Sequence, residues 1–261
     1  MMLAVIGAVA FGVSLLTLFS GFGLGTLLMP VFALFFPVET AVAATAVVHG
    51  ANSFFKVGIL GREIDRSVLV RFGVPAVLAA LIGAWLLTRL SGQAPLLRWQ
   101  LGERIAEVTP VGLVMGLLIL GFAAFELVPA LRELRAPTRY LPLGGALSGF
   151  FGGLSGHQGA LRAAFLTPLG LTPPTFAATQ AALAALVDLS RLAVYAAGFF
   201  AGTLAGPVGG QWTAVVAGSL AAFAGALVGK RLLGKATMDG VRALTGVLLL
   251  IVGAGLASGL L

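Results

Sequence analysis

Two apolar stretches of this chain each carry three polar residues at spacings of 3 and 4. They are His49, Asn52 and Lys56 in the first stretch and Asp188, Arg191 and Tyr195 in the second. Such spacings place side chains on one face of a helix. Charged groups within apolar helices usually face a bundle interior or a water-filled cavity. Arginine and lysine suit anion binding, and histidine suits proton transfer near neutral pH.

Each of these groups also has an interpretation without function. Lys56 is near its helix end, so its ammonium could reach the membrane surface along its apolar stem. Asp188 and Arg191 could neutralise each other as an ion pair within one helix. His49 could be a neutral histidine that packs helices together, and Asn52 could do the same through a hydrogen bond. The spacing alone leaves these alternatives open.

Two glycine-rich motifs interrupt apolar segments at corresponding places in the two halves of the chain. The first covers residues 20–26 and precedes Pro30; the second covers residues 149–159 and precedes Pro168. Paired, glycine-broken segments of this kind are typical of the binding site of a secondary transporter. A short helix that starts after such a break directs backbone N–H groups and a positive dipole end toward an anion. Glycine also lets the two breaks approach each other closely.

We therefore predict an anion site built from both breaks and both polar faces. The predicted substrate ligands are Gly21, Gly23, Gly25, Thr26, Asn52, Lys56, Gly156, His157, Gln158, Arg162 and Arg191. Arg162 offers a planar donor that suits an oxyanion with several acceptors. The predicted proton-coupling residues are His49, His157 and Asp188.

The composition indicates that lipid is the main solvent of the chain. Of its 261 residues, 59% are hydrophobic and 10% are charged, and the mean hydropathy is +1.07. A soluble domain of this length carries far more charge. The net charge is +7, but the sequence contains no soluble domain long enough to present a basic surface. We therefore expect the basic residues to set the membrane orientation and not to bind nucleic acid.

The sequence gives no sign of an enzyme. It contains no cysteine and two histidines without carboxylates at ligand spacing, so we expect no metal site. A phosphate-binding motif with its Gly-Lys-Ser/Thr ending is missing, so the chain carries no recognisable ATP site. We expect no cofactor and no catalytic residue.

The apolar blocks predict an all-α integral membrane protein with about 8 transmembrane helices, or up to 10 segments if broken halves are counted separately. Repeat 1 covers residues 1–135, and repeat 2 covers residues 140–261. Each repeat comprises a broken hairpin and three spans. These are the hairpin 3–36 and spans 38–59, 68–90 and 110–131 in repeat 1, and the hairpin 140–171 and spans 175–199, 208–230 and 239–260 in repeat 2.

The basic residues predict the orientation of these segments. With both termini outside, the cytoplasmic loops hold Arg62, Arg66, Arg71, Arg132, Arg135, Arg139, Lys230, Arg231, Lys235 and Arg242. The outer side then holds only Arg89, Arg98 and Arg104. This imbalance fits the positive-inside rule. Because each repeat crosses the membrane an odd number of times, the two repeats have inverted topology. Between residues 91 and 109 we expect a loop with an amphipathic stretch at 96–105.

At the glycine motifs and at residues 41–45, the chain resembles the sulfite exporter TauE/SafE family, also called the toluene sulfonate uptake permease family. The resemblance covers essentially the whole chain. It implies a multi-pass carrier in the bacterial inner membrane for sulfite, sulfonates or related organosulfur anions. Arg162 departs from the family pattern, which has a hydrophobic residue there, so the identity of the anion stays open.

We thus expect a secondary transporter of small anions that works by alternating access, with histidine as a candidate for proton coupling. The alternatives are an anion channel and a carrier of small carboxylates. The expected partners are the anionic substrate and the bilayer. Small residues at Gly218, Gly225 and Gly229 could pack helices inside a bundle or between protomers, which leaves a homo-oligomer open.

Overall fold

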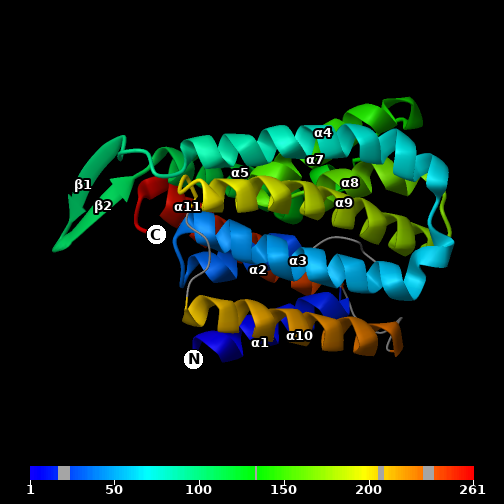
Figure 1. The fold of residues 1–261 in the computed structure, drawn as a ribbon, viewed down its shortest axis with the longest axis horizontal. Helices are drawn as coiled ribbons and strands as arrows, with labels where there is room; N and C mark the ends of the chain where they lie inside the picture. Colours follow the sequence, from blue (N-terminus) through cyan, green and yellow to red (C-terminus); the bar gives the residue numbers. More distant parts are fainter. Residues whose placement is uncertain (17–23, 133, 205–208, 232–237) are drawn as a thin grey trace.

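A computed structural model describes residues 1–16, 24–132, 134–204, 209–231 and 238–261. Within them the chain forms long helices that lie side by side, with a small β-hairpin projecting from one end (Figure 1). The elements are α1 (Met2–Leu16), α2 (Leu24–Ala33), α3 (Val38–Leu60), α4 (Arg66–Leu90), β1 (Leu97–Leu101), β2 (Arg104–Val108), α5 (Pro110–Leu127), α6 (Pro129–Arg132), α7 (Leu141–Ser155), α8 (Gly159–Leu166), α9 (Pro173–Phe200), α10 (Gly210–Arg231) and α11 (Met238–Ser258).

The second glycine motif breaks a helix, as the sequence predicts. Helix α7 ends at Ser155, and α8 begins at Gly159. Gly156 ends α7 with a φ of +84°, a left-handed conformation that favours glycine. The first motif falls largely between α1 and α2, and its Gly21 and Gly23 lie outside the described residues.

The segment between α4 and α5 is not the loop with an amphipathic stretch that we expected. It contains an antiparallel β-hairpin in which Leu97 pairs with Val108 and Leu101 pairs with Arg104. Gly102 supplies a φ of +61° at the turn. The prediction of a loop is therefore wrong for this segment, because alternation over five residues fits a short strand as well as a turn of amphipathic helix. The other described elements are helical, in line with the predicted all-α class.

Two helix pairs pack with their backbones in close contact at glycines. Three glycines on α7, four residues apart, face α4; a Cβ added at Gly149 would lie 2.0 Å from the carbonyl oxygen of Ala76. On α10, a Cβ added at Gly225 would lie 2.2 Å from the carbonyl oxygen of Phe11 on α1. The glycine face of α10 therefore packs on α1 inside this chain.

Helices α3 and α9 cross the centre of the molecule between these two pairs (Figure 1). They contact each other where Gly50 of α3 lies against Asp188 of α9, with 3.2 Å between an added Cβ and the Asp188 Cβ. Threonines cap both α5 and α9: the side chains of Thr109 and Thr172 accept hydrogen bonds from the backbone of the first helical turn. Of the predicted site residues, α3 carries His49, Asn52 and Lys56, and α9 carries Asp188 and Arg191.

Several helices have the length and apolar surface of membrane spans. Among the described residues, four helices are long and apolar enough to cross a bilayer: Arg66–Leu90, Pro110–Leu127, Pro173–Phe200 and Gly210–Gly229. Helix α4 presents a stripe of exposed apolar side chains at Val70, Val74, Leu78 and Ile82. A stripe of this kind, repeated every four residues, suits contact with lipid. The chain is a multi-pass membrane protein.

Candidate functional site

Asp188 is the centre of a buried hydrogen-bond network between α3, α9 and the second break. Its Oδ2 lies 2.6 Å from Nδ1 of His49 on α3. Its Oδ1 accepts from Nε and Nη2 of Arg191, at 2.9 and 2.7 Å, and from Nε2 of Gln158 at 3.3 Å. Asp188 and Arg191 are fully buried. The carboxylate therefore joins the two halves of the chain and orients three donors.

Arg162 extends this network toward the start of α9. Its Nη1 donates to Oε1 of Gln158 at 2.9 Å, and its Nε donates to Oε1 of Gln180. Ser148 of α7 holds the break in place, because its hydroxyl donates to the Gln158 carbonyl at 3.0 Å. Lys56 of α3 is buried within electrostatic range of Arg162, and the two cations repel each other.

The start of α2 lies against the second break. A Cβ added at Gly25 would be 3.1 Å from the Gly156 carbonyl oxygen and 3.4 Å from the His49 ring. A Cβ added at Gly156 would be 2.8 Å from Nη1 of Arg191. Glycine at both positions thus allows the two halves to meet beside the charged side chains, as the sequence predicts.

Several buried donor and acceptor atoms of the site have no hydrogen-bond partner among the described residues. They are Nη1 of Arg191, Nε2 of Gln180, Nε2 of His157 and Oγ1 of Thr45. The His157 ring stacks on Phe122, with 5.2 Å between the ring centres, and its Nδ1 lies 3.2 Å from the Ser155 hydroxyl. Buried polar atoms without partners are rare in folded proteins and point to a missing ligand or water.

Cationic side chains outnumber carboxylates around Asp188. Three cations, Lys56, Arg162 and Arg191, accompany one carboxylate, Asp188. Glu126 of α5 is a further buried carboxylate, and both Glu126 and Arg162 make another interaction besides these. Burying an unbalanced cation is costly, so a bound anion would relieve the cost.

These contacts bear on two of the interpretations that the spacing left open. Lys56 is 9% exposed, so its side chain remains inside the protein. Asp188 and Arg191 form the intrahelical ion pair, yet the same carboxylate also binds His49 and Gln158. The pair is therefore part of a network that joins three helical segments.

Not every predicted residue joins the network through a described contact. Asn52 accepts a hydrogen bond from Ser14 of α1 at 3.3 Å, which matches its interpretation as a link between helices. Thr26 is buried in α2. Gln180 and Tyr195 belong to the site although we did not predict them as ligands. Gln180 precedes Asp188 by eight residues, about two turns, and this spacing could have revealed it.

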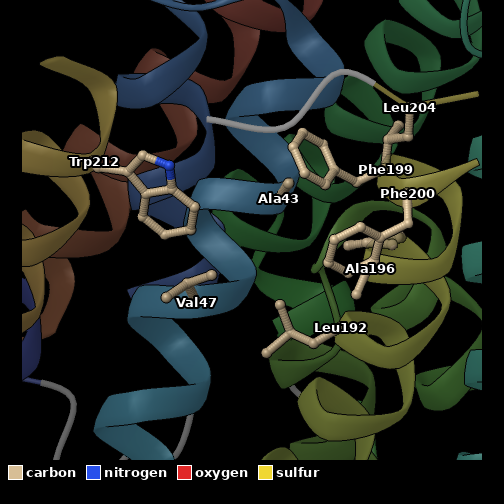
Figure 2. A pocket seen from close by; sticks show the side chains of 9 residues that line it. Ala43, Val47, Leu192, Ala196, Phe199, Phe200, Leu204 and Trp212 are labelled. Atoms are coloured by element: carbon tan, nitrogen blue, oxygen red, sulfur yellow. The ribbon is translucent and has the colours of Figure 1, made fainter. Parts of the chain in front are cut away.

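A cavity of about 330 Å³ lies next to the network, between α3, α9 and α10 (Figure 2). Its lining is mostly apolar, with the Tyr195 hydroxyl and the Trp212 indole N–H as its polar side-chain groups. It comprises Ala43, Val47, Leu192, Tyr195, Ala196, Phe199, Phe200, Leu204 and Trp212. Figure 2 shows Trp212 on one side of α3 and the α9 side chains on the other. Tyr195 donates a hydrogen bond to the Gly153 carbonyl of α7 and lies within electrostatic range of Arg191.

The described residues contain no group of three or more His, Cys, Asp or Glu side chains that could hold a metal ion. Neither a curated protein nor a solved structure matches the chain. The family model described as "Sulfite exporter TauE/SafE" matches residues 6–256 of the 261, which is nearly the whole chain. The members of that family are membrane transporters, and this chain belongs to the sulfite exporter TauE/SafE family.

Proposed function

We propose that the protein is a secondary transporter of a small anion, namely sulfite, a sulfonate or a related organosulfur anion. One observation carries the proposal. The buried network of Asp188 has an excess of cations and contains donors, Nη1 of Arg191 and Nε2 of Gln180, without partners among the described residues. A small oxyanion would neutralise the excess charge and accept hydrogen bonds from these donors.

Arginine is suited to this substrate class. Sulfite and sulfonates present several oxygens on one sulfur atom, and the planar guanidinium fork can donate to two oxygens together. In our proposal Arg191 and Arg162 hold the anion, and Lys56 adds positive charge on the α3 side. The backbone at Gly156 lies close enough to Arg191 to form part of the same site.

Alternating access between two inverted repeats is part of the proposal. Reciprocal packing supports it, because α4 of the first half packs on α7 of the second, and α10 of the second packs on α1 of the first. Helices α3 and α9, and likewise α5 and α11, pair across the centre. If each helix is exchanged with its counterpart in the other half, the same set of helix pairs results. This is the pattern expected for a pseudo-two-fold axis in the membrane plane.

We also propose that transport is coupled to protons through His49 and Asp188. These residues come from opposite halves and share a hydrogen bond of 2.6 Å. A change in the protonation of His49 would alter the contact between α3 and α9, which is the contact that a change of access would move. His49→Gln should retain anion exchange between two compartments and lose pH-driven accumulation in proteoliposomes.

For the membrane orientation we propose the bacterial inner membrane with both termini outside. The two termini and the β-hairpin lie at one end of the molecule, and the α3–α4 connection lies at the other (Figure 1). Arg62 and Arg139 are exposed at that second end. Because the chain has no cysteine, single variants Gln100→Cys and Arg62→Cys can be labelled in intact cells with an impermeant maleimide. Labelling of Gln100→Cys alone is expected; the reverse pattern would contradict this orientation.

Ligand-dependent thermal stabilisation tests the anion site. A ligand that binds only the folded protein raises the Tm once its concentration passes the Kd. We expect sulfite or methanesulfonate to raise the Tm, and Arg162→Ala to abolish the increase while the variant still elutes as a folded protein. Arg89→Ala is the matched control, because Arg89 is exposed and lies over the Trp85 ring.

The other outcomes assign a different function. Stabilisation by short carboxylates alone would indicate a carboxylate carrier. Flux that rises linearly with the gradient, without stimulation by anion on the opposite side, would indicate a channel. No stabilisation by any of these anions, together with no flux in proteoliposomes, would overturn the proposal.

A further inference from the structure

The hydrogen bond between His49 and Asp188 divides the α3–α9 contact into two parts. The two helices are antiparallel (Figure 1), and the backbone N–H of Asp65, just beyond the end of α3, donates to the Thr179 hydroxyl near the start of α9 at 2.9 Å. Residues that precede His49 on α3 therefore lie level with residues that follow Asp188 on α9, and the reverse holds on the other side.

One polar group, the Arg191 group, lies about one helical turn to one side of this hydrogen bond. It consists of Thr45, four residues before His49, and Arg191, three residues after Asp188. Both side chains are fully buried, and Oγ1 of Thr45 and Nη1 of Arg191 have no hydrogen-bond partner among the described residues. A hydroxyl and a guanidinium N–H can both donate to an anion. The group therefore offers two unused donors.

A second polar group, the Arg162 group, lies about two turns to the other side. Lys56 follows His49 by seven residues, and Gln180 precedes Asp188 by eight. Arg162 joins them, because its Nε donates to Oε1 of Gln180 and its charge lies within electrostatic range of Lys56. Nε2 of Gln180 is a buried donor without a partner in the described parts of the chain. This group therefore has cations and an unused donor of its own.

The two groups draw on equivalent places in the two halves of the chain. Counted from the first residue of each helix, Thr45 on α3 and Gln180 on α9 are both the eighth residue. Lys56 and Arg191 are both the nineteenth. Eleven residues make about three turns, so the two members on each helix share a face and lie about 16 Å apart along its axis. Each group thus combines the eighth residue of one helix with the nineteenth of the other, the exchange expected for inverted repeats.

We propose that the transported anion binds at two successive positions along the α3–α9 contact, one in each group. The inference rests on the proposed anion transport and adds that Arg162 and Arg191 hold the anion in turn, on opposite sides of the His49–Asp188 hydrogen bond. The Arg162 group lies toward the α3–α4 connection, and the Arg191 group lies toward the end that carries the termini and the β-hairpin (Figure 1). Each position therefore serves one side of the membrane.

Two substitutions on α3 separate the positions. Thr45→Val removes a hydroxyl that has no partner among the described residues, and Lys56→Met removes an ammonium that Arg162 repels. Neither should lower the Tm, because an unsatisfied polar group and a repelled charge both cost stability when buried. Loss of a donor to a charged ligand weakens binding about tenfold or more.

Exchange of labelled sulfite, measured in right-side-out and in inverted membrane vesicles, reports the two faces separately. Thr45→Val should raise the half-saturating sulfite concentration about tenfold on one face, and Lys56→Met should do so on the opposite face. The double variant should show both changes without further coupling, because the two sites are separate. Ser190→Ala is the matched control, since the Ser190 hydroxyl donates to the Leu186 carbonyl within α9, and it should leave both faces unchanged.

The outcomes separate this inference from the function on which it rests. If Thr45→Val and Lys56→Met weaken binding equally on both faces, the anion occupies a single position and the inference fails. It also fails if neither variant changes binding on either face, because the two residues then serve packing alone. If wild-type vesicles exchange neither sulfite nor methanesulfonate, the proposed function fails and this inference fails with it.

Discussion

Two helix contacts in this protein, α3–α9 and α4–α7, join the same two halves of the chain by opposite means. The α4–α7 contact is made by backbone: glycines at 145, 149 and 153 face the carbonyl oxygens of Phe72, Ala76 and Ala80 at every fourth residue. The α3–α9 contact is made by side chains, with His49 against Asp188 and a cavity beside them. Close backbone packing and the polar site therefore occur in different helix pairs.

The physical reason lies in what each contact has to exclude. Glycine packing brings helix axes close and leaves no space for a ligand, and in lipid such packing contributes much of helix association. A charged network needs helices that are far enough apart to hold its long side chains and an anion. It therefore cannot form at a contact where glycines bring two helix backbones together. Tyr195 links the two, because it sits on α9 beside Arg191 and donates to Gly153 of α7.

The largest expected effect comes from removing the carboxylate of the polar contact. Asp188→Leu leaves Arg191 buried without its acceptor, and breaking a buried pair from one side costs about 3–5 kcal/mol. We expect this loss in the free energy of unfolding, measured by denaturant titration of the detergent-purified protein, together with loss of anion transport.

The double variant Asp188→Leu/Arg191→Leu tests whether the two residues stabilise the fold as a pair. Replacing both partners by apolar residues removes the unpaired charge, so stability should recover in part while transport stays absent. Stability losses that simply add in the double variant would contradict the idea that the two residues stabilise the fold as a pair.

Adding a single methyl group at the glycine contact between α4 and α7 should lower the stability of the fold. Gly149→Ala would place a Cβ 2.0 Å from the Ala76 carbonyl oxygen, so α4 and α7 must move apart. Overpacking of this kind costs about 1–3 kcal/mol. Gly121→Ala on α5 is the matched control, because a Cβ there meets nothing within 4 Å. A lower Tm for Gly149→Ala with no loss for Gly121→Ala is expected; equal effects would mean that helix propensity, and not close packing, governs both sites.

Much of this arrangement was predictable from local pattern. Helix boundaries followed apolar length, and the break at Gly156 followed from glycine density between two short apolar blocks. The 3-and-4 spacing on each central helix placed His49 with Lys56 and Asp188 with Arg191 on shared faces. Such inferences need only the period of a helix and the cost of charge in lipid.

The pairing of those faces was beyond the sequence, because nothing in the period of one helix specifies its neighbour. The hydrogen bond of Asp188 to His49, 139 residues away, depends on tertiary packing, as does the contact of Gly25 with Gly156. The β-hairpin was missed because its five-residue strands are too short for alternation to be decisive. The apolar cavity forms where three helices meet, so the pattern of a single segment cannot predict it.

The smallest expected effect concerns the residue that joins the two contacts. Tyr195→Phe removes the hydroxyl that donates to the Gly153 carbonyl and keeps the ring that lines the cavity. Hydrogen bonds between membrane helices contribute about 0.6 kcal/mol on average, so the loss in unfolding free energy should be of that size. The other tyrosine, Tyr140, is exposed beside Arg139 and gives the matched control Tyr140→Phe, which should change nothing. If Tyr195→Phe instead leaves stability unchanged and weakens sulfite binding severalfold, the hydroxyl serves the anion and not the link between α9 and α7.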